Sequence, residues 1–336
     1  MRTTAIVLAA AAVSLLAGAA SGTSSTLKVA YITDFASSAT PHDLRGAALL
    51  GFQRAVKRFR VDGRVLQFPP KQGAAPTLEL LGRQHYGLVI VGEVRGPIDF
   101  NDVLDVAQRF PRTKFVLLDP PFLRQRWPAN VQGSLWRVEE PAYVAGYLAG
   151  LMERRRPGPD VVGSVGGFPI VNVDTFIAGF EAGAKAADPG VRTIHQYAYD
   201  FLNTAKCRRV ALGEIAAGAG VVFNVAGTCG FGTIAAAKEK GVWAVGVDVD
   251  QSFLGPQVLT SVLKHFDVQV HDIVGAYAAG KLKTGREAVW DLGNGTVGLG
   301  PISPKVPKSI LKQLDSVRAR IVAGVVQVPT NVSASA

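Results

Sequence analysis

Residues 242–251 read VWAVGVDVDQ, an apolar run of strand length that ends in Asp248, Asp250 and Gln251. Near-continuous apolar runs of this kind are typical of strands that are buried in parallel sheets. Ligands of such sheets bind outside the carboxyl ends of the strands. A carboxylate at that position is a cap, a surface group or a ligand group, and for Asp248 the residues alone leave cap and ligand group open.

The same pattern recurs along the chain and alternates with helical spacing of apolar residues. Seven further runs have strand length: LKVAYITD (27–34), YGLVIVGE (86–93), TKFVLLD (113–119), VVGSVGG (161–167), TIHQYAYD (193–200), VVFNVAG (221–227) and LTSVLKH (259–265). Four segments between runs have helical spacing: residues 44–59, 140–152, 175–186 and 231–241. This alternation predicts an α/β protein with parallel sheets and helices on both faces.

The length of 336 residues predicts two lobes, because single cores stop growing at about 250–300 residues. A seam is expected at LWRVEEPAYV (135–144), where Pro141 suits the first turn of a helix. We expect residues 27–137 and 262–284 to form an N-terminal lobe. Residues 138–261 and 285–330 are expected to form a C-terminal lobe, so the chain crosses between the lobes more than once.

The first residues, MRTTAIVLAAAAVSLLAGAASG, combine an early Arg, an apolar run and the small residues Ala17, Gly18 and Ala19. This pattern predicts a secretory signal peptide over residues 1–20. The alternative is a membrane anchor, but the run is shorter than the ~20 residues that a spanning helix needs. Neither Cys lies at the cleavage site, so we expect an exported protein, periplasmic or released, without a lipid anchor.

Cys207 and Cys229 are the two cysteines of the chain. An even pair in an exported protein favours a disulfide, with two buried free thiols as the alternative. Their separation fits no metal motif, and we expect no metal and no cofactor. The net charge is +10. The basic clusters lie at ends of predicted helices and do not alternate with stacking aromatics, so no nucleic-acid partner is expected.

Known catalytic motifs are missing from the sequence. The Gly-rich stretches GSVGGFP (163–169) and AGTCGFG (226–232) lack the Gly-Lys-Ser/Thr ending of a Walker loop and do not fit G-x-G-x-x-G. The five histidines include no H-E-x-x-H pair, and His195 lies inside a predicted strand, where a structural imidazole is favoured over a catalytic base. We therefore predict a binding protein rather than an enzyme.

The second half of the chain resembles the basic membrane protein family of ABC-transporter solute-binding proteins, which includes purine nucleoside receptors. The resemblance covers most of residues 137–303. It is carried by VEEPAYVAGYLAGLM (138–152), VGGFPIVNVDTFIAGFEAGAKAADPGV (165–191), GVDVDQSFLGPQVLTSVLKHFDVQV (246–270) and GTVGLGPIS (295–303). It implies a type I periplasmic-binding fold: two α/β lobes joined by a three-strand hinge, with the ligand between them.

The resemblance also implies roles for single residues. Asp248 would hold ribose hydroxyls, Lys264 would reach the same cleft, and Asp34 matches a strand-end Asp of the family. Asp119 and Phe201 lie where related binders place a hydroxyl acceptor and a stacking ring. Four more candidates follow from their positions after strands: Phe35, Glu93, Phe168 and Thr228.

We therefore expect a monomeric, exported solute-binding protein that presents a nucleoside-like ligand to an ABC permease. Two segments depart from the family: residues 35–52 lack its Asn, and VGEVRGPIDF (91–100) replaces an aromatic-rich loop. The sequence consequently leaves the exact ligand open. The alternatives are an exported enzyme that acts on nucleosides or sugars, and a binding module that feeds a signalling receptor.

Overall fold

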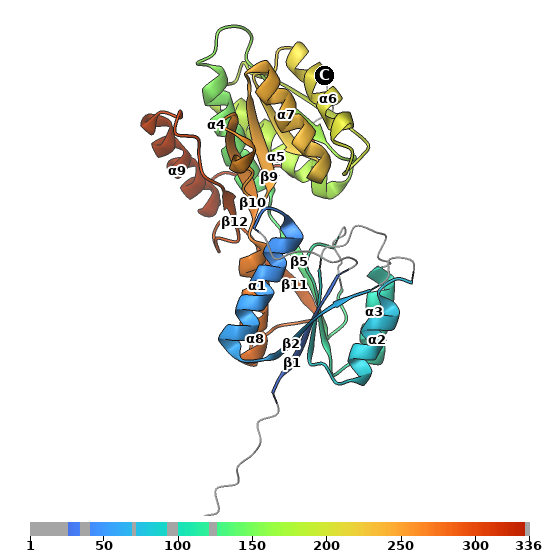
Figure 1. Cartoon of the computed structure of the whole chain (residues 1–336). Helices are drawn as coiled ribbons and strands as arrows, with labels where there is room; N and C mark the ends of the chain where they lie inside the picture. Colours follow the sequence, from blue (N-terminus) through green and yellow to red (C-terminus); the bar gives the residue numbers. More distant parts are fainter. Residues whose placement is uncertain (1–25, 34–40, 69–71, 93–99, 121–125, 333–336) are drawn as a thin grey trace, which may run out of the picture.

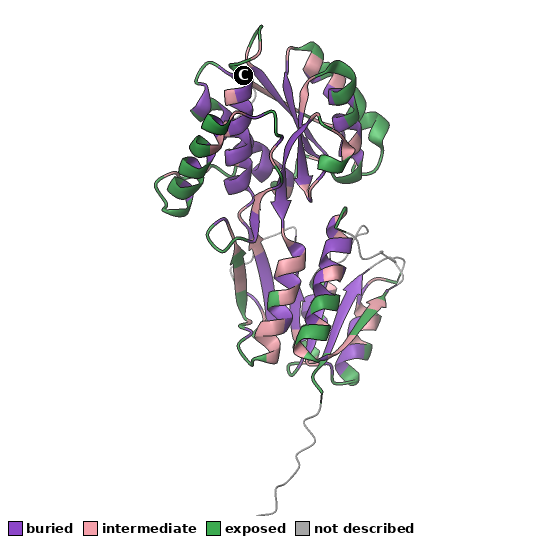
Figure 2. Cartoon of the chain, turned by 60° about the vertical axis from the view of Figure 1, so that its left-hand side comes forward, coloured by how far each residue is buried: buried purple, intermediate pink, exposed green. Residues whose placement is uncertain are grey.

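The computed structural model describes residues 26–33, 41–68, 72–92, 100–120 and 126–332. Within these residues the chain forms two six-stranded sheets, one in each of two lobes stacked end to end (Figure 1). The buried strands run through the middle of each lobe, and the exposed residues lie on the outer faces of the helices (Figure 2). The α/β architecture predicted from the alternating runs is confirmed.

The first sheet has the strand order β11-β5-β4-β3-β1-β2, and all of its neighbours are parallel. Helices α1 (Leu44–Phe59) and α8 (Phe266–Ala278) lie together on one side, and α2 (Ala75–Arg83) and α3 (Phe100–Arg109) lie on the other (Figure 1). Its strands are β1 (Lys28–Thr33), β2 (Asp62–Gln67), β3 (Leu88–Val91), β4 (Lys114–Leu117), β5 (Val131–Trp136) and β11 (Arg286–Trp290).

The second sheet has the order β12-β10-β9-β8-β6-β7, with β12 as an antiparallel edge strand. Its strands are β6 (Val161–Gly166), β7 (Arg192–Tyr197), β8 (Val221–Val225), β9 (Trp243–Asp248), β10 (Val258–Lys264) and β12 (Val297–Leu299). Its helices are α4 (Glu139–Glu153), α5 (Val171–Ala187), α6 (Thr204–Ala216), α7 (Phe231–Lys240) and α9 (Lys308–Val322). The short 3₁₀ turns η1 (Gly227–Gly230) and η2 (Ser252–Leu254) follow β8 and β9.

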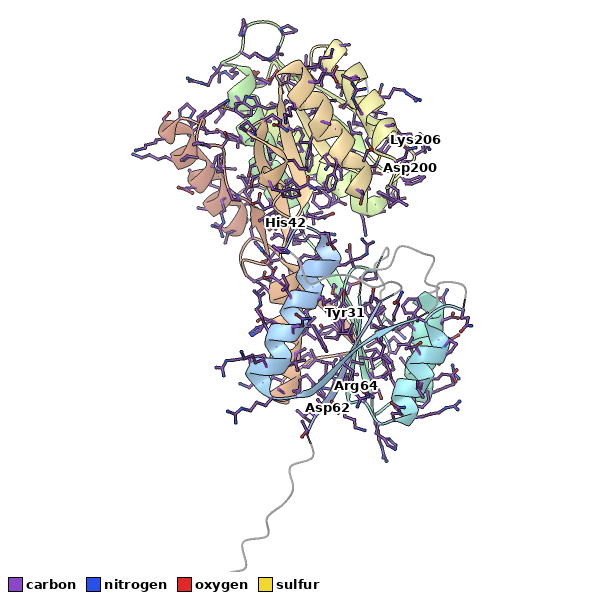
Figure 3. All side chains as sticks on the ribbon, viewed as in Figure 1. Tyr31, His42, Asp62, Arg64, Asp200 and Lys206 are labelled. Carbon is purple, nitrogen blue, oxygen red and sulfur yellow. A yellow bond between two sulfur atoms is a disulfide. The ribbon has the colours of Figure 1, made fainter. Side chains whose placement is uncertain are left out.

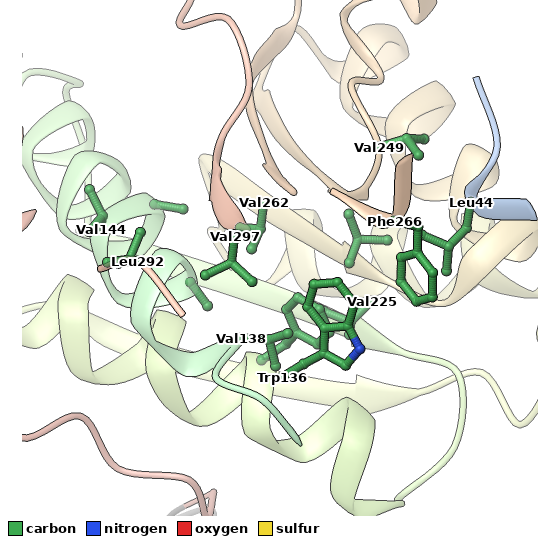
Figure 4. Packing of buried hydrophobic residues seen from close by; sticks show 14 of the residues in the cluster. Leu44, Trp136, Val138, Val144, Val225, Val249, Val262, Phe266, Leu292 and Val297 are labelled. Carbon is green, nitrogen blue, oxygen red and sulfur yellow. The ribbon is translucent and has the colours of Figure 1, made fainter. Parts of the chain in front are cut away.

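The chain crosses between the lobes three times, at residues 137–138, 265 and 291–296. Hydrogen bonds tie the crossings together: Arg137 N–H donates to the Trp290 carbonyl over 2.9 Å, and His265 N–H donates to the Thr296 carbonyl over 2.9 Å. The hinge core is aromatic, because Trp136 stacks on Phe266 with 4.8 Å between ring centroids (Figure 4). The expected three-strand hinge is present.

Two expected lobe boundaries are wrong. Residues 262–264 end β10 and therefore belong to the second sheet, so the crossing comes at residue 265. Residues 286–290 pair in parallel with β5 and belong to the first sheet. The segment REAVW is short and half polar, as an edge strand can be, and it gave no apolar run that could be recognised in the sequence.

Four strands were not predicted, namely β2, β5, β11 and β12. β2 is an edge strand with the sequence DGRVLQ and no fully buried residue, which explains why it carries no apolar signature. The predicted signal peptide lies outside the described residues. Among the described helices, none is long and apolar enough to cross a membrane.

Helices α4 and α5 pack backbone against backbone through glycines. A Cβ added at Gly183 would lie 2.0 Å from the Tyr143 carbonyl oxygen, far inside van der Waals contact. We expect Gly183→Ala to push the helices apart and to lower the free energy of unfolding by about 1–3 kcal/mol, measured by denaturant titration.

Gly213, on the exposed side of α6, is the matched control, because a Cβ there meets nothing within 4 Å. Gly213→Ala should raise the free energy of unfolding by about 0.5–1 kcal/mol, since Ala has the higher helix propensity. Equal effects of the two substitutions would contradict the close α4–α5 packing.

Candidate functional site

A cavity of about 710 Å³ lies between the carboxyl ends of the two sheets and is lined from both lobes. The first lobe contributes the start of α1 and the ends of β3 and β4, and His42 faces the second lobe there (Figure 3). Six of the predicted residues line the cavity: Asp119, Phe168, Phe201, Thr228, Asp248 and Lys264. The other three candidates, Asp34, Phe35 and Glu93, lie outside the described residues.

Asp248 ends β9 in a left-handed conformation, with φ 66°. The Val249 N–H donates to the Val247 carbonyl over 2.7 Å, so Asp248 is the central residue of a tight three-residue turn. A γ-turn with positive φ is rare and strained, and non-glycine residues in such a conformation gather at functional sites. Among the described residues, none donates a hydrogen bond to the Asp248 carboxylate.

The neighbouring carboxylate has a local structural role. Asp250 accepts from the Ser252 N–H and the Ser252 hydroxyl, both over 2.9 Å, and so stabilises the turn that leads into η2. Asp250 is not among the residues that line the cavity. The two acids of VGVDVDQ therefore differ in role: Asp250 stabilises a local turn, and Asp248 lies at the cavity.

Burial raises the pKa of Asp248 above its ordinary value. The Asp119 carboxylate raises it further, whereas the cations Lys264 and Arg45 lower it. Holding this carboxylate ionised in a desolvated cleft costs free energy unless hydrogen bonds satisfy it. Asp248 is therefore a strong acceptor that lacks a described donor.

Lys264 connects the lobes across the cavity floor. Its Nζ lies 2.9 Å from Asp119 Oδ2, and both side chains are largely buried. Three rings surround the ammonium, since Nζ lies 5.6–5.8 Å from the ring centroids of Trp136, Phe176 and Phe266, within the range of cation–π attraction. The ion pair joins the end of β10 to the end of β4, so it fixes one lobe relative to the other.

An aromatic wall faces the cavity from the second lobe. Phe168 contacts Phe201 with 5.1 Å between centroids and Tyr199 with 6.1 Å. Tyr199 is 61% exposed and Phe201 is 37% exposed, although large apolar rings are normally covered. The wall therefore offers ring faces on which a flat apolar group can pack.

The predicted disulfide between Cys207 and Cys229 is formed. It links α6 to η1, where Cys229 N–H also donates to the Phe201 carbonyl over 2.9 Å. Because Gly227 and Thr228 line the cavity from this turn, the bridge fixes one wall of the site.

Several cavity residues were not predicted, namely His42, Arg45, Asn172, Tyr199 and Gln251. Arg45 could have been found, because a cation in the first turn of a helix opposes the helix dipole and suggests another partner. Asp200 also lines the cavity, but its carboxylate already has hydrogen-bond and ion-pair partners within the protein. The N–H groups of Asn203 and Leu202, together with Lys206, lower the pKa of Asp200 to about 2. Figure 3 shows Asp200 and Lys206 next to each other.

His195 lies away from the cavity. Its Nδ1 is 2.8 Å from Glu181 Oε1, and this hydrogen bond raises the pKa of His195. The structural reading of this imidazole is thus consistent with the contacts. No group of three or more His, Cys, Asp or Glu side chains among the described residues could hold a metal ion.

Comparisons with known proteins agree with this geometry. The family model for PnrA-like ABC transporter substrate-binding proteins (Bmp) matches residues 48–332. Basic membrane protein A of Borreliella afzelii is 31% identical over 237 residues, which cover 69% of this chain and 72% of that protein. A CD4+ T-cell-stimulating antigen of Listeria monocytogenes is 30% identical over 242 residues, 67% of this chain and 66% of that protein.

Solved structures share the fold. An ABC transporter solute-binding protein from Aeropyrum pernix K1 superimposes with a TM-score of 0.75 at 20% identity, covering 91% of this chain and 94% of that one. One from Conexibacter woesei gives a TM-score of 0.71 at 24% identity, covering 91% and 99%. Both are type I periplasmic-binding folds, which confirms the expected fold class. The chain belongs to the Bmp family of PnrA-like ABC transporter substrate-binding proteins, a family of extracytoplasmic solute-binding proteins rather than enzymes.

Proposed function

We propose that this protein binds a neutral nucleoside, or a related sugar-bearing compound, between its lobes and delivers it to the permease of an ABC importer. The observation that carries this proposal is the Asp248 carboxylate, which lines the cavity without a described hydrogen-bond donor. A carboxylate has two oxygens that can each accept from one hydroxyl of a ribose diol. Such bonds would compensate the cost of its desolvation.

The aromatic wall supports a ligand with a flat ring. Phe168, Tyr199 and Phe201 present ring faces to the same cavity that Asp248 lines. A nucleoside joins a diol to a planar base, and so matches both parts. Simple sugars match only the first part, and most amino acids match neither.

The charges of the cavity support a neutral ligand. Lys264 pairs with Asp119, and Arg45 acts on Asp248, so these four charges balance. Two further carboxylates at the cavity already have partners close by in the sequence. Asp43 accepts from Gly46 N–H over 2.8 Å, and Asp200 pairs with Lys206. A phosphate on the ligand would add a buried negative charge. Among the described residues that line the cavity, both cations already face an acid, so this charge would lack a partner.

Binding would shift the equilibrium between an open and a closed arrangement of the two lobes about the hinge. A ligand that contacts Asp248 from one side and the start of α1 from the other favours the closed arrangement, because only that arrangement offers both contacts. Export after removal of residues 1–20, a periplasmic or released location and a monomeric state belong to the same proposal. A freely diffusing monomer suffices, because the cavity is built from one chain.

A thermal-shift screen of the chain from residue 21 tests the ligand class. We expect nucleosides to raise the melting temperature more than nucleobases, sugars, amino acids or nucleoside monophosphates. Asp248→Ala should weaken nucleoside binding by at least about 100-fold, because two hydrogen bonds to a charged group contribute roughly 1.5–3 kcal/mol each.

Asp250→Ala is the control two residues away. It should lower the free energy of unfolding by about 0.5–1.5 kcal/mol through loss of the local hydrogen bonds to Ser252, yet leave the dissociation constant unchanged within about twofold. Calorimetric titration of both variants measures this. Undiminished binding by Asp248→Ala would refute the role of its carboxylate, and conversion of the bound nucleoside on incubation would favour an enzyme.

The raised pKa of Asp248 also gives a test without ligand. A carboxyl whose pKa is raised on folding stabilises the fold only while protonated, and this contribution is lost as pH rises through the raised pKa. Asp248→Asn should therefore melt higher than the wild type at pH 7.5, with a gain that shrinks as pH falls toward 4. Asn tolerates the left-handed conformation as Asp does, so the backbone strain is unchanged. A gain that is independent of pH would show that Asp248 is not desolvated.

A further inference from the structure

A buried network of polar side chains lies directly behind the Asp248 turn. Asn224 lies in β8, Gln251 follows β9 and Ser261 lies in the middle of β10, and all three are almost completely buried. The Asn224 Nδ2 donates to Gln251 Oε1 over 3.1 Å, and Gln251 N–H donates to Ser261 Oγ over 3.0 Å. Three neighbouring strands are thus linked by side chains as well as by their sheet pairing.

The backbone donors around the network decide how both amides are oriented. Asn224 Oδ1 accepts from Ala226 N–H over 3.0 Å, so its Nδ2 must face Gln251. Gln251 Oε1 also accepts from Val247 N–H over 3.3 Å. Each amide oxygen therefore anchors a backbone N–H at the start of a cavity loop, Ala226 before η1 and Val247 before Asp248.

Two glycines leave the room that the amides occupy. A Cβ at Gly230 would lie 1.5 Å from Asn224 Oδ1, and a Cβ at Gly246 would lie 2.8 Å from Gln251 Oε1 and 2.5 Å from Ser261 Oγ. The backbone of η1 and that of β9 thus pack directly against the network. Any side chain at these two positions would displace it.

The network holds the chain on either side of Asp248. Val247 is bound through its N–H to the Gln251 side chain, and Gln251 is bound through its own N–H to Ser261. The segment between these anchors is too short for an extended path, and Asp248 takes the left-handed conformation in its middle. The strain at Asp248 persists because surrounding contacts determine it.

We propose that Asn224 and Gln251 are positioning residues of the ligand site: their buried amide pair imposes the left-handed turn that directs Asp248 to the cavity, and it anchors the residue 226–230 loop beside it. The effect on ligand affinity rests on the proposed function, whereas the effect on the backbone at Asp248 does not. Asn224 gives the cleaner test, because Gln251 lines the cavity and Asn224 does not.

A stability cycle on the intact ligand-free chain tests the backbone effect. The melting temperatures of Asp248→Gly and Asp248→Ala are compared in two backgrounds, one with Asn224 intact and one that also carries Asn224→Ala. The difference between the two melting temperatures is called the Gly preference. Gly accepts a positive φ that Ala resists, so with Asn224 present we expect Asp248→Gly to melt about 2 °C above Asp248→Ala. With Asn224→Ala the difference should fall to about zero, because the turn is no longer imposed. The unfolded-state entropy of Gly is the same in both backgrounds and cancels in the comparison.

An equal preference for Gly in both backgrounds would overturn the inference. Asn224→Ser, which keeps a small polar group for Ala226 N–H, replaces Asn224→Ala if the latter does not fold. Thr260→Val is the matched control: it removes a buried hydrogen bond to the Gly300 carbonyl in the same sheet, and the Gly preference should survive it.

Affinity gives the second readout. Asn224→Ala should weaken nucleoside binding about 10-fold, and Thr260→Val should leave it within about twofold. If Asp248→Ala binds nucleosides normally, the proposed function fails, and the stability cycle still decides the role of Asn224. If Asp248→Ala loses binding while Asn224→Ala keeps both full affinity and the Gly preference, the positioning role fails and the proposed function stands.

Discussion

The structure depends on one constraint, which is that the carboxyl ends of two parallel sheets face a common space. A parallel strand order places every loop that follows a strand at the same edge of its sheet. The three crossings hold those two edges opposite each other, and the main-chain bonds between Arg137 and Trp290 and between His265 and Thr296 fix the path of the crossings. Polar side chains at strand ends, which lie far apart in sequence, consequently meet in one cavity.

The cavity joins two kinds of electrostatic element. The Lys264–Asp119 pair is satisfied within the protein, because each charge has the other as a partner and three rings cover the ammonium. Asp248 has cations nearby but no described hydrogen-bond donor, and burial raises its pKa. A satisfied pair fixes the lobes relative to each other, whereas an acceptor without a described donor suits the ligand-binding role proposed for Asp248. This contrast explains why the two acids, both at strand ends, are assigned different roles.

The sequence predicted those parts of the fold that leave apolar runs. All eight runs correspond to strands, and the four helical segments correspond to α1, α4, α5 and α7. The edge strands β2 and β11 were missed because one or both faces are exposed and their residues do not form a run, and this omission shifted the boundary at residue 285. Strand-end positions found Asp119, Thr228 and Asp248. Tyr199, two residues after the end of β7, was missed although it follows a strand. Arg45 was missed because a cation in the first turn of a helix indicates a partner without placing it at the cavity.

The network behind Asp248 was also beyond prediction from the sequence. Asn224 lies inside an apolar strand, and nothing local indicates that its amide meets Gln251, 27 residues later. Polar residues inside such strands are costly unless they are paired, so their presence indicates a specific partner without naming it.

The most direct measurement is a crystal structure of the protein with a bound nucleoside. We expect both oxygens of Asp248 to lie about 2.5–3.0 Å from the two ribose hydroxyls, with the base packed against Phe168 and Phe201. A ligand whose hydroxyls face away from Asp248, or a nucleoside absent from the cavity at saturating concentration, would contradict it.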